Sequence, residues 1–151
     1  MKIKFILAAI LAMIPSLASA AVGESECTED VLFRFFPKVF VLEVLEKHDI
    51  PKDRAEEIAA NLADSDQRVV QLIEEKADQM TPNPLQEEGS HEERAKLFKE
   101  AITEVFNSVV NKYGITDTKE IMAMIDEIQQ LRIERFEECR RQGHVPDMLQ
   151  R

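Results

Sequence analysis

One segment near the N-terminus, residues 27–48, constrains the fold more than any other part of the chain. Its apolar side chains point in nearly every direction around a helix, and four of the 8 phenylalanines lie in it. A helix that is apolar on all sides must be buried on most of them. The later segments each have a single apolar stripe, so we expect them to pack around residues 27–48.

The spacing of apolar residues predicts helices in most of the remaining chain. Pro37 interrupts the first segment, which predicts either a kinked helix or a short helix followed by a second one. The next stripe keeps its phase from Ala55 to Met80 and predicts one long helix over about 52–80, with a capped break near Ser65 as the alternative. A linker over about 81–89 and two further helices, about 91–113 and 118–141, complete the pattern.

Residues with special backbone preferences mark the expected helix ends. Ser90 and Glu93 form a capping box, and Asp117 is a second N-cap signal. Gly114 and Gly143 are placed to end the two last helices. The tail over about 144–151 is expected to fray.

Two helix connections in the sequence are alike. Residues 47–53 resemble residues 112–118 in the order of lysine, turn residue and isoleucine. This similarity fits a duplicated helical hairpin, and it equally fits a common way of joining helices. In both cases Asp49 tolerates the left-handed turn that glycine provides in the second copy, and Ile50 and Ile115 should pack beneath their turns.

The two cysteines suggest how the helices are ordered. Cys27 and Cys139 lie near the two ends of the domain, and an up-down path of four helices would place them at the same end. A chain that folded back near Ser65 would separate them by about 30 Å. An intermolecular bridge or two free thiols remain open at this point. We predict an all-α, four-helix up-down bundle with a kinked first helix and a Cys27–Cys139 disulfide joining the N- and C-terminal helices.

The first 20 residues have the features of a secretory signal peptide. Lys2 and Lys4 give a basic start, residues 5–14 are apolar, and residues 18–20 read Ala-Ser-Ala. The apolar run is too short for a spanning helix, which needs about 20 residues. We therefore expect cleavage after Ala20, a single helical domain over 21–151 without stable membrane insertion, and a periplasmic or secreted location.

The charge of the chain restricts its partners. The formal charge is −10, and loss of Lys2 and Lys4 with the signal peptide would make it −12. Such a charge argues against nucleic acid and anionic membranes as partners. Another protein is the expected partner, and a basic surface would complement this charge.

No group of residues in the sequence has the spacing of a catalytic or metal site, so we expect neither an enzyme nor a bound cofactor. His48, His91 and His144 fall at helix ends or in the tail, and no H-E-x-x-H motif is present. Residues 64–66, Asp-Ser-Asp, resemble the start of a calcium loop but lack its later glycine and glutamate.

The functional expectation is therefore a non-enzymatic, exported binding protein. It would be chaperone-like or inhibitor-like and act through its acidic surface or an apolar groove, with a carrier of an apolar ligand inside the bundle as the alternative. The candidate apolar binding surface consists of Phe33, Phe36, Phe40, Met122 and Met124. The predicted core consists of Phe35, Phe36, Phe40, Phe98, Ile102, Val105, Ile125 and Ile128.

Overall fold

The computed structural model describes residues 23–86 and 91–145, and in these two stretches every regular element is helical. The elements are a 3₁₀ turn η1 (Glu24–Glu26) and the helices α2 (Glu29–Leu32), α3 (Lys38–Lys47), α4 (Lys52–Ala63), α5 (Asp66–Asp78), α6 (His91–Asn111) and α7 (Thr118–Arg141). None of these helices is long and apolar enough to cross a membrane. The predicted signal peptide, the Ser90 cap and residues 146–151 of the tail lie outside the described residues.

Pro37 separates the first apolar segment into two helices. It is the N-cap residue of α3, with φ of −58°, and α2 has already ended at Leu32. Since proline cannot donate the backbone hydrogen bond that a continuous helix would need, the chain leaves helical geometry before it. The structure has the second of the two forms considered, a short helix followed by another, so the kinked first helix of the predicted bundle is wrong.

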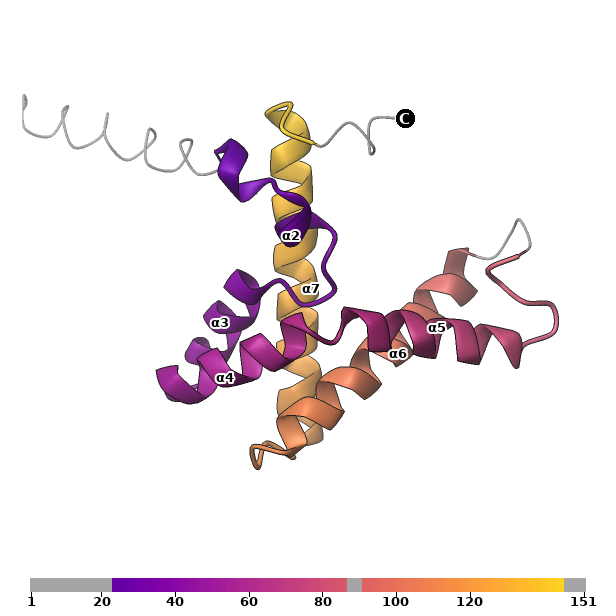
Figure 1. Cartoon of the computed structure of the whole chain (residues 1–151), viewed down its shortest axis with the longest axis horizontal. Helices are drawn as coiled ribbons and strands as arrows, with labels where there is room; N and C mark the ends of the chain where they lie inside the picture. The colour runs from indigo at the N-terminus through magenta and orange to yellow at the C-terminus, as the bar shows by residue number, and fades with distance from the viewer. Residues whose placement is uncertain (1–22, 87–90, 146–151) are drawn as a thin grey trace, which may run out of the picture.

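The predicted single helix over 52–80 is wrong, because the chain breaks at Asp64 and Ser65. The Ser65 hydroxyl donates to the carbonyl of Leu62, and α5 starts at Asp66. The break is a bend: α5 continues onward from the end of α4 and does not fold back beside it (Figure 1). An apolar stripe that stays in phase is therefore compatible with one continuous helix and with two helices joined at a bend.

The helices pack as two pairs with α7 laid across them. α3 contacts α4, α5 contacts α6, and α6 also reaches α4. α7 contacts α2, α3 and α6 and stands across the other helices (Figure 1). The described chain thus has six α-helices where the sequence predicted four, and an up-down bundle of four is not confirmed.

Both helix connections close with the same backbone geometry. Asp49 and Gly114 have φ of 64° and 81°, in the left-handed region. The following amides, of Ile50 and Ile115, donate to carbonyls five residues earlier over 3.0 and 3.2 Å, and both isoleucines pack against the core as predicted. The predicted N-cap Asp117 accepts hydrogen bonds from the two amides at the start of α7.

The predicted disulfide is confirmed. Cys27 and Cys139 are bonded, with Cα atoms 5.8 Å apart. The disulfide links residues that are 112 positions apart in the sequence. Both cysteines are buried, and they form a small apolar cluster with Leu32 and Val145, separate from the main core.

The main core contains most of its predicted members. Phe36, Phe40, Ile102, Val105, Ile125 and Ile128 are buried, and Phe35 packs against them while half-buried. Phe98 was predicted wrongly, since 39% of it is exposed. α6 buries the neighbouring Leu97, and one residue further is about 100° further around a helix, which places Phe98 at the edge of the core.

The contrast between two phenylalanines gives a direct test of the core. Phe36→Ala should lower the free energy of unfolding by about 3–5 kcal/mol, because it removes a fully buried ring that contacts Phe106. Phe98→Ala should change it by less than about 1 kcal/mol. Urea denaturation of both variants measures the difference, and equal losses would show that the core has been misplaced.

Candidate functional site

The structure does not assemble the predicted apolar binding surface. Phe36, Phe40 and Met124 are buried in the core, so they are inaccessible to a partner. Phe33 is 39% exposed, and Met122 is half-buried beside a separate hollow of about 470 Å³ between α6 and α7. Residues 27–48 are covered on most sides, as their composition predicted. Phe36 and Phe40 belong to this segment, and with Met124 three of the five predicted residues are buried.

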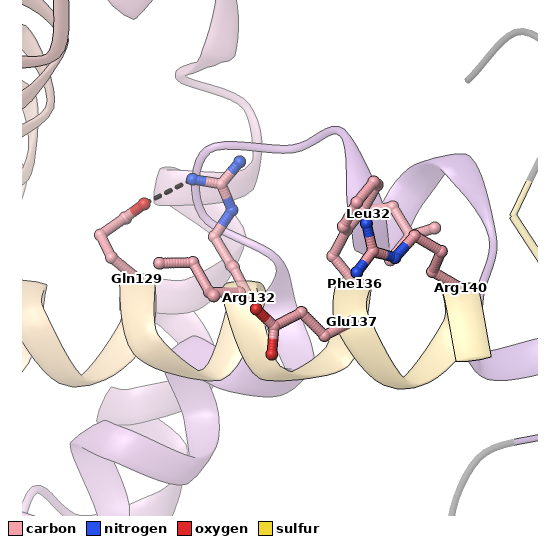
Figure 2. A pocket seen from close by; sticks show the side chains of 7 residues that line it. Leu32, Gln129, Arg132, Phe136, Glu137 and Arg140 are labelled. Carbon is pink, nitrogen blue, oxygen red and sulfur yellow. Dashed lines mark hydrogen bonds between the residues drawn. The ribbon is translucent and has the colours of Figure 1, made fainter. Parts of the chain in front are cut away.

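A different apolar surface lies along α7. One hollow of about 400 Å³ opens between α2 and α7, and Figure 2 shows its lining residues: Leu32, Gln129, Arg132, Ile133, Phe136, Glu137 and Arg140. A second, of about 450 Å³, opens between α6 and α7 and is lined by Phe35, Ala95, Phe98, Lys99, Ile102, Ile125, Asp126, Gln129, Arg132 and Ile133. Because the hollows share Gln129, Arg132 and Ile133, we describe them together as the α7 groove.

The groove leaves apolar side chains in contact with water. Ile133, at the junction of the two hollows, is 52% exposed, and Phe98 on the opposite wall is 39% exposed. Large apolar side chains that converge on one hollow differ from the scattered exposed ones found on most proteins, and they are typical of ligand or partner sites.

One wall of the groove depends on the segment that joins α2 and α3. The amide of Phe35 donates to Asp66 Oδ1 over 3.2 Å, and the carbonyl of Phe35 accepts from the Gln129 side chain over 3.4 Å. Arg34 adds an ion pair of 3.4 Å to Asp66 Oδ2. The segment is thereby fixed to both α5 and α7, and Phe35 is held against the groove.

Arg132 is the most unusual polar residue of the groove. Among the described residues its side chain donates one hydrogen bond, to Gln129 Oε1 (Figure 2). Its guanidinium lies 5.9 Å from the centre of the Phe35 ring. Its Nε is buried and has no hydrogen-bond partner among the residues that the structure describes. Burial lowers the pKa of the guanidinium below its usual range, and the charge of Asp66 offsets this in part.

The other charges at the groove are exposed or already paired. Lys99 and Asp126 face each other across α6 and α7 at 3.7 Å. Glu137 and Arg140 line the hollow beside α2, where both are exposed. The groove is thus apolar in its walls, with a partly desolvated cation at its centre.

The histidine at the end of α3 has its partner away from the groove. His48 Nε2 lies 3.0 Å from Glu127 Oε2, where α3 meets α7. Burial raises the pKa of Glu127, but contacts with His48 and Lys47 outweigh it and hold that pKa below its ordinary value. Among the described residues, no group of three or more His, Cys, Asp or Glu side chains is placed to hold a metal ion.

One residue of the sequence, Ile133, indicates the groove, although the spacing of apolar residues did not identify it. Ile133 does not fall on the buried stripe of α7, whose members include Ile125 and Ile128. An apolar residue off the stripe, next to Arg132, marks a second apolar direction on this helix. No periodicity argument alone could have placed Phe98 opposite it.

The comparisons with known proteins give no relative from which a role could be transferred. No family model matches the chain, and neither a curated protein nor a solved structure matches it significantly.

The anchoring of the groove wall can be tested at two neighbouring aspartates. Asp66→Ala should lower the free energy of unfolding by about 1–2 kcal/mol, because the Phe35 amide loses its acceptor. Asp64→Ala removes the same charge from an exposed position two residues earlier and should cost less than about 0.5 kcal/mol. Thermal unfolding measures the loss of stability in the two variants. A larger loss for Asp64→Ala than for Asp66→Ala would show that Asp66 does not anchor the groove wall.

Proposed function

We propose that this protein is an exported, non-enzymatic binding protein that holds the apolar part of another molecule in the α7 groove. The observation behind this proposal is the convergence of Phe35, Phe98 and Ile133 on one open hollow of about 450 Å³. Sites for small molecules and for apolar segments of proteins have this combination of size, apolar walls and a few polar groups.

The proposed location rests on two features. The buried Cys27–Cys139 disulfide suits an oxidising compartment, and residues 1–20 have the pattern of a cleavable signal peptide. A periplasmic or secreted protein with an apolar groove could act in a chaperone-like or inhibitor-like way, and both roles need binding alone.

The groove is a better candidate than the two other surfaces that the sequence suggested. A general acidic surface names no contact point. The alternative of a carrier with its ligand among the core phenylalanines has no support, because Phe36 and Phe106 pack with their ring centres 5.8 Å apart and both are fully buried. We therefore place the bound apolar group at the surface, against α7.

A neutral dye whose fluorescence rises in apolar surroundings, N-phenyl-1-naphthylamine, can test the groove. Ile133→Asp should weaken its binding at least about tenfold, because it puts a charge where an apolar contact is needed. Val39→Asp is the matched control: Val39 on α3 is 49% exposed, close to the 52% of Ile133, and does not line the groove.

Two results would contradict the proposal. One is the absence of dye binding to the unmodified protein. The other is an equal effect of Ile133→Asp and Val39→Asp, which would mean that the dye binds elsewhere or that any added charge weakens it.

A further inference from the structure

Arg132 has unused hydrogen-bonding capacity at the centre of the groove. A guanidinium has five N–H donors, and among residues 23–86 and 91–145 the only hydrogen bond from this one goes to the neutral side chain of Gln129. The buried Nε has no hydrogen-bond partner in the part of the chain that the structure describes. A cation that has lost part of its water without gaining an acidic partner is destabilised, and an anion that reached it would relieve that cost.

Among the described residues, no carboxylate near Arg132 forms an ion pair with it. The charge of Asp66 acts on Arg132, but the Asp66 carboxylate accepts a hydrogen bond from the Phe35 amide and pairs with Arg34. Asp126 is paired with Lys99. Glu137 lines the same hollow, but no ion pair joins it to Arg132 among the described residues.

The space on either side of Arg132 differs in character. The hollow toward α6 has Phe35, Phe98 and Ile102 in its walls, and its two charged residues other than Arg132 are the ones that pair with each other. The hollow toward α2 contains the exposed Glu137 and Arg140 and is open to water. An apolar chain therefore fits the α6 side, with its polar end at Arg132.

From these observations we infer that the α7 groove binds a single-chain anionic amphiphile, a long-chain carboxylate, with its carboxylate on the Arg132 guanidinium and its alkyl chain along Phe35, Phe98 and Ile102. The inference rests on the proposed function and specifies its ligand. Guanidinium and carboxylate match in geometry as well as in charge, since two parallel N–H donors can meet two oxygens.

The charge of the whole protein makes the inference sharper. At a formal charge of −10, the protein as a whole repels anions and attracts cations. General electrostatics thus predicts that a cationic amphiphile binds better than an anionic one with the same chain. A preference for the anion would have to come from a local contact.

Calorimetry with two amphiphiles tests this preference. The exported protein, purified with its disulfide intact, is titrated with dodecanoate and with dodecyltrimethylammonium, both below the concentrations at which micelles form. We expect dodecanoate to bind at least about tenfold more tightly. Arg132→Gln should remove most of that preference, and Arg132→Lys should retain part of it. Arg68→Gln, which removes the same charge from an exposed site on α5, should leave it unchanged.

The outcomes separate this inference from the proposed function. Equal affinities for the two amphiphiles, or a preference that survives Arg132→Gln, would overturn the carboxylate assignment while binding of the neutral dye still supports the groove. If neither the dye nor either amphiphile binds, both proposals fail. Should Arg132→Gln not fold, the ratio of affinities in the unmodified protein and in Arg132→Lys decides the question.

Discussion

The attachment of the N-terminal segment to α7 is the interaction on which the groove depends. The Cys27–Cys139 disulfide holds one end of this segment on α7, and the hydrogen bond from the Gln129 side chain to the Phe35 carbonyl holds the other. The Arg135 side chain of α7 also donates to the carbonyl of Glu26, the residue before Cys27, over 3.4 Å. In the chain-entropy model, closing a loop of this length raises the free energy of the unfolded chain by about 4–5 kcal/mol. Without this attachment Leu32 and Phe35 would not be walls of a groove.

The groove remains open because the helices around α7 differ in length and direction. α2 ends after one turn at Leu32, and α6 crosses α7 at an angle (Figure 1). The 24 residues of α7 therefore extend past what either neighbour can cover. Side chains on its uncovered flank, Ile133 above all, stay at the surface. A helix end that served only to hold the disulfide would not need an apolar residue there.

Several features of the fold could be predicted from the sequence because they depend on local chemistry. The left-handed turns at Asp49 and Gly114, the cap at Asp117 and the helix stop before Pro37 all follow from the preferences of single residues. The disulfide followed from compartment and cysteine count. These inferences need no knowledge of how helices meet.

The errors concern how helices meet. The unbroken helix was preferred to a break near Ser65 because a bend leaves the apolar stripe in phase. The predicted connection between an unbroken helix and the disulfide assumed that a break must reverse the chain. Phe98 and Ile133 were misjudged or overlooked because their exposure depends on where α6 and α7 diverge. The position of Arg132 beneath Phe35 likewise depends on contacts between residues nearly a hundred positions apart.

Amide hydrogen exchange before and after reduction of the disulfide tests the central claim most directly. If the bridge pins the N-terminal segment to α7, reduction should speed exchange in α2 and in the last turns of α7, while α4, α5 and α6 keep their protection, because their burial does not involve the bridge. Unchanged exchange in α2, or loss of protection spread evenly over all the helices, would contradict the claim.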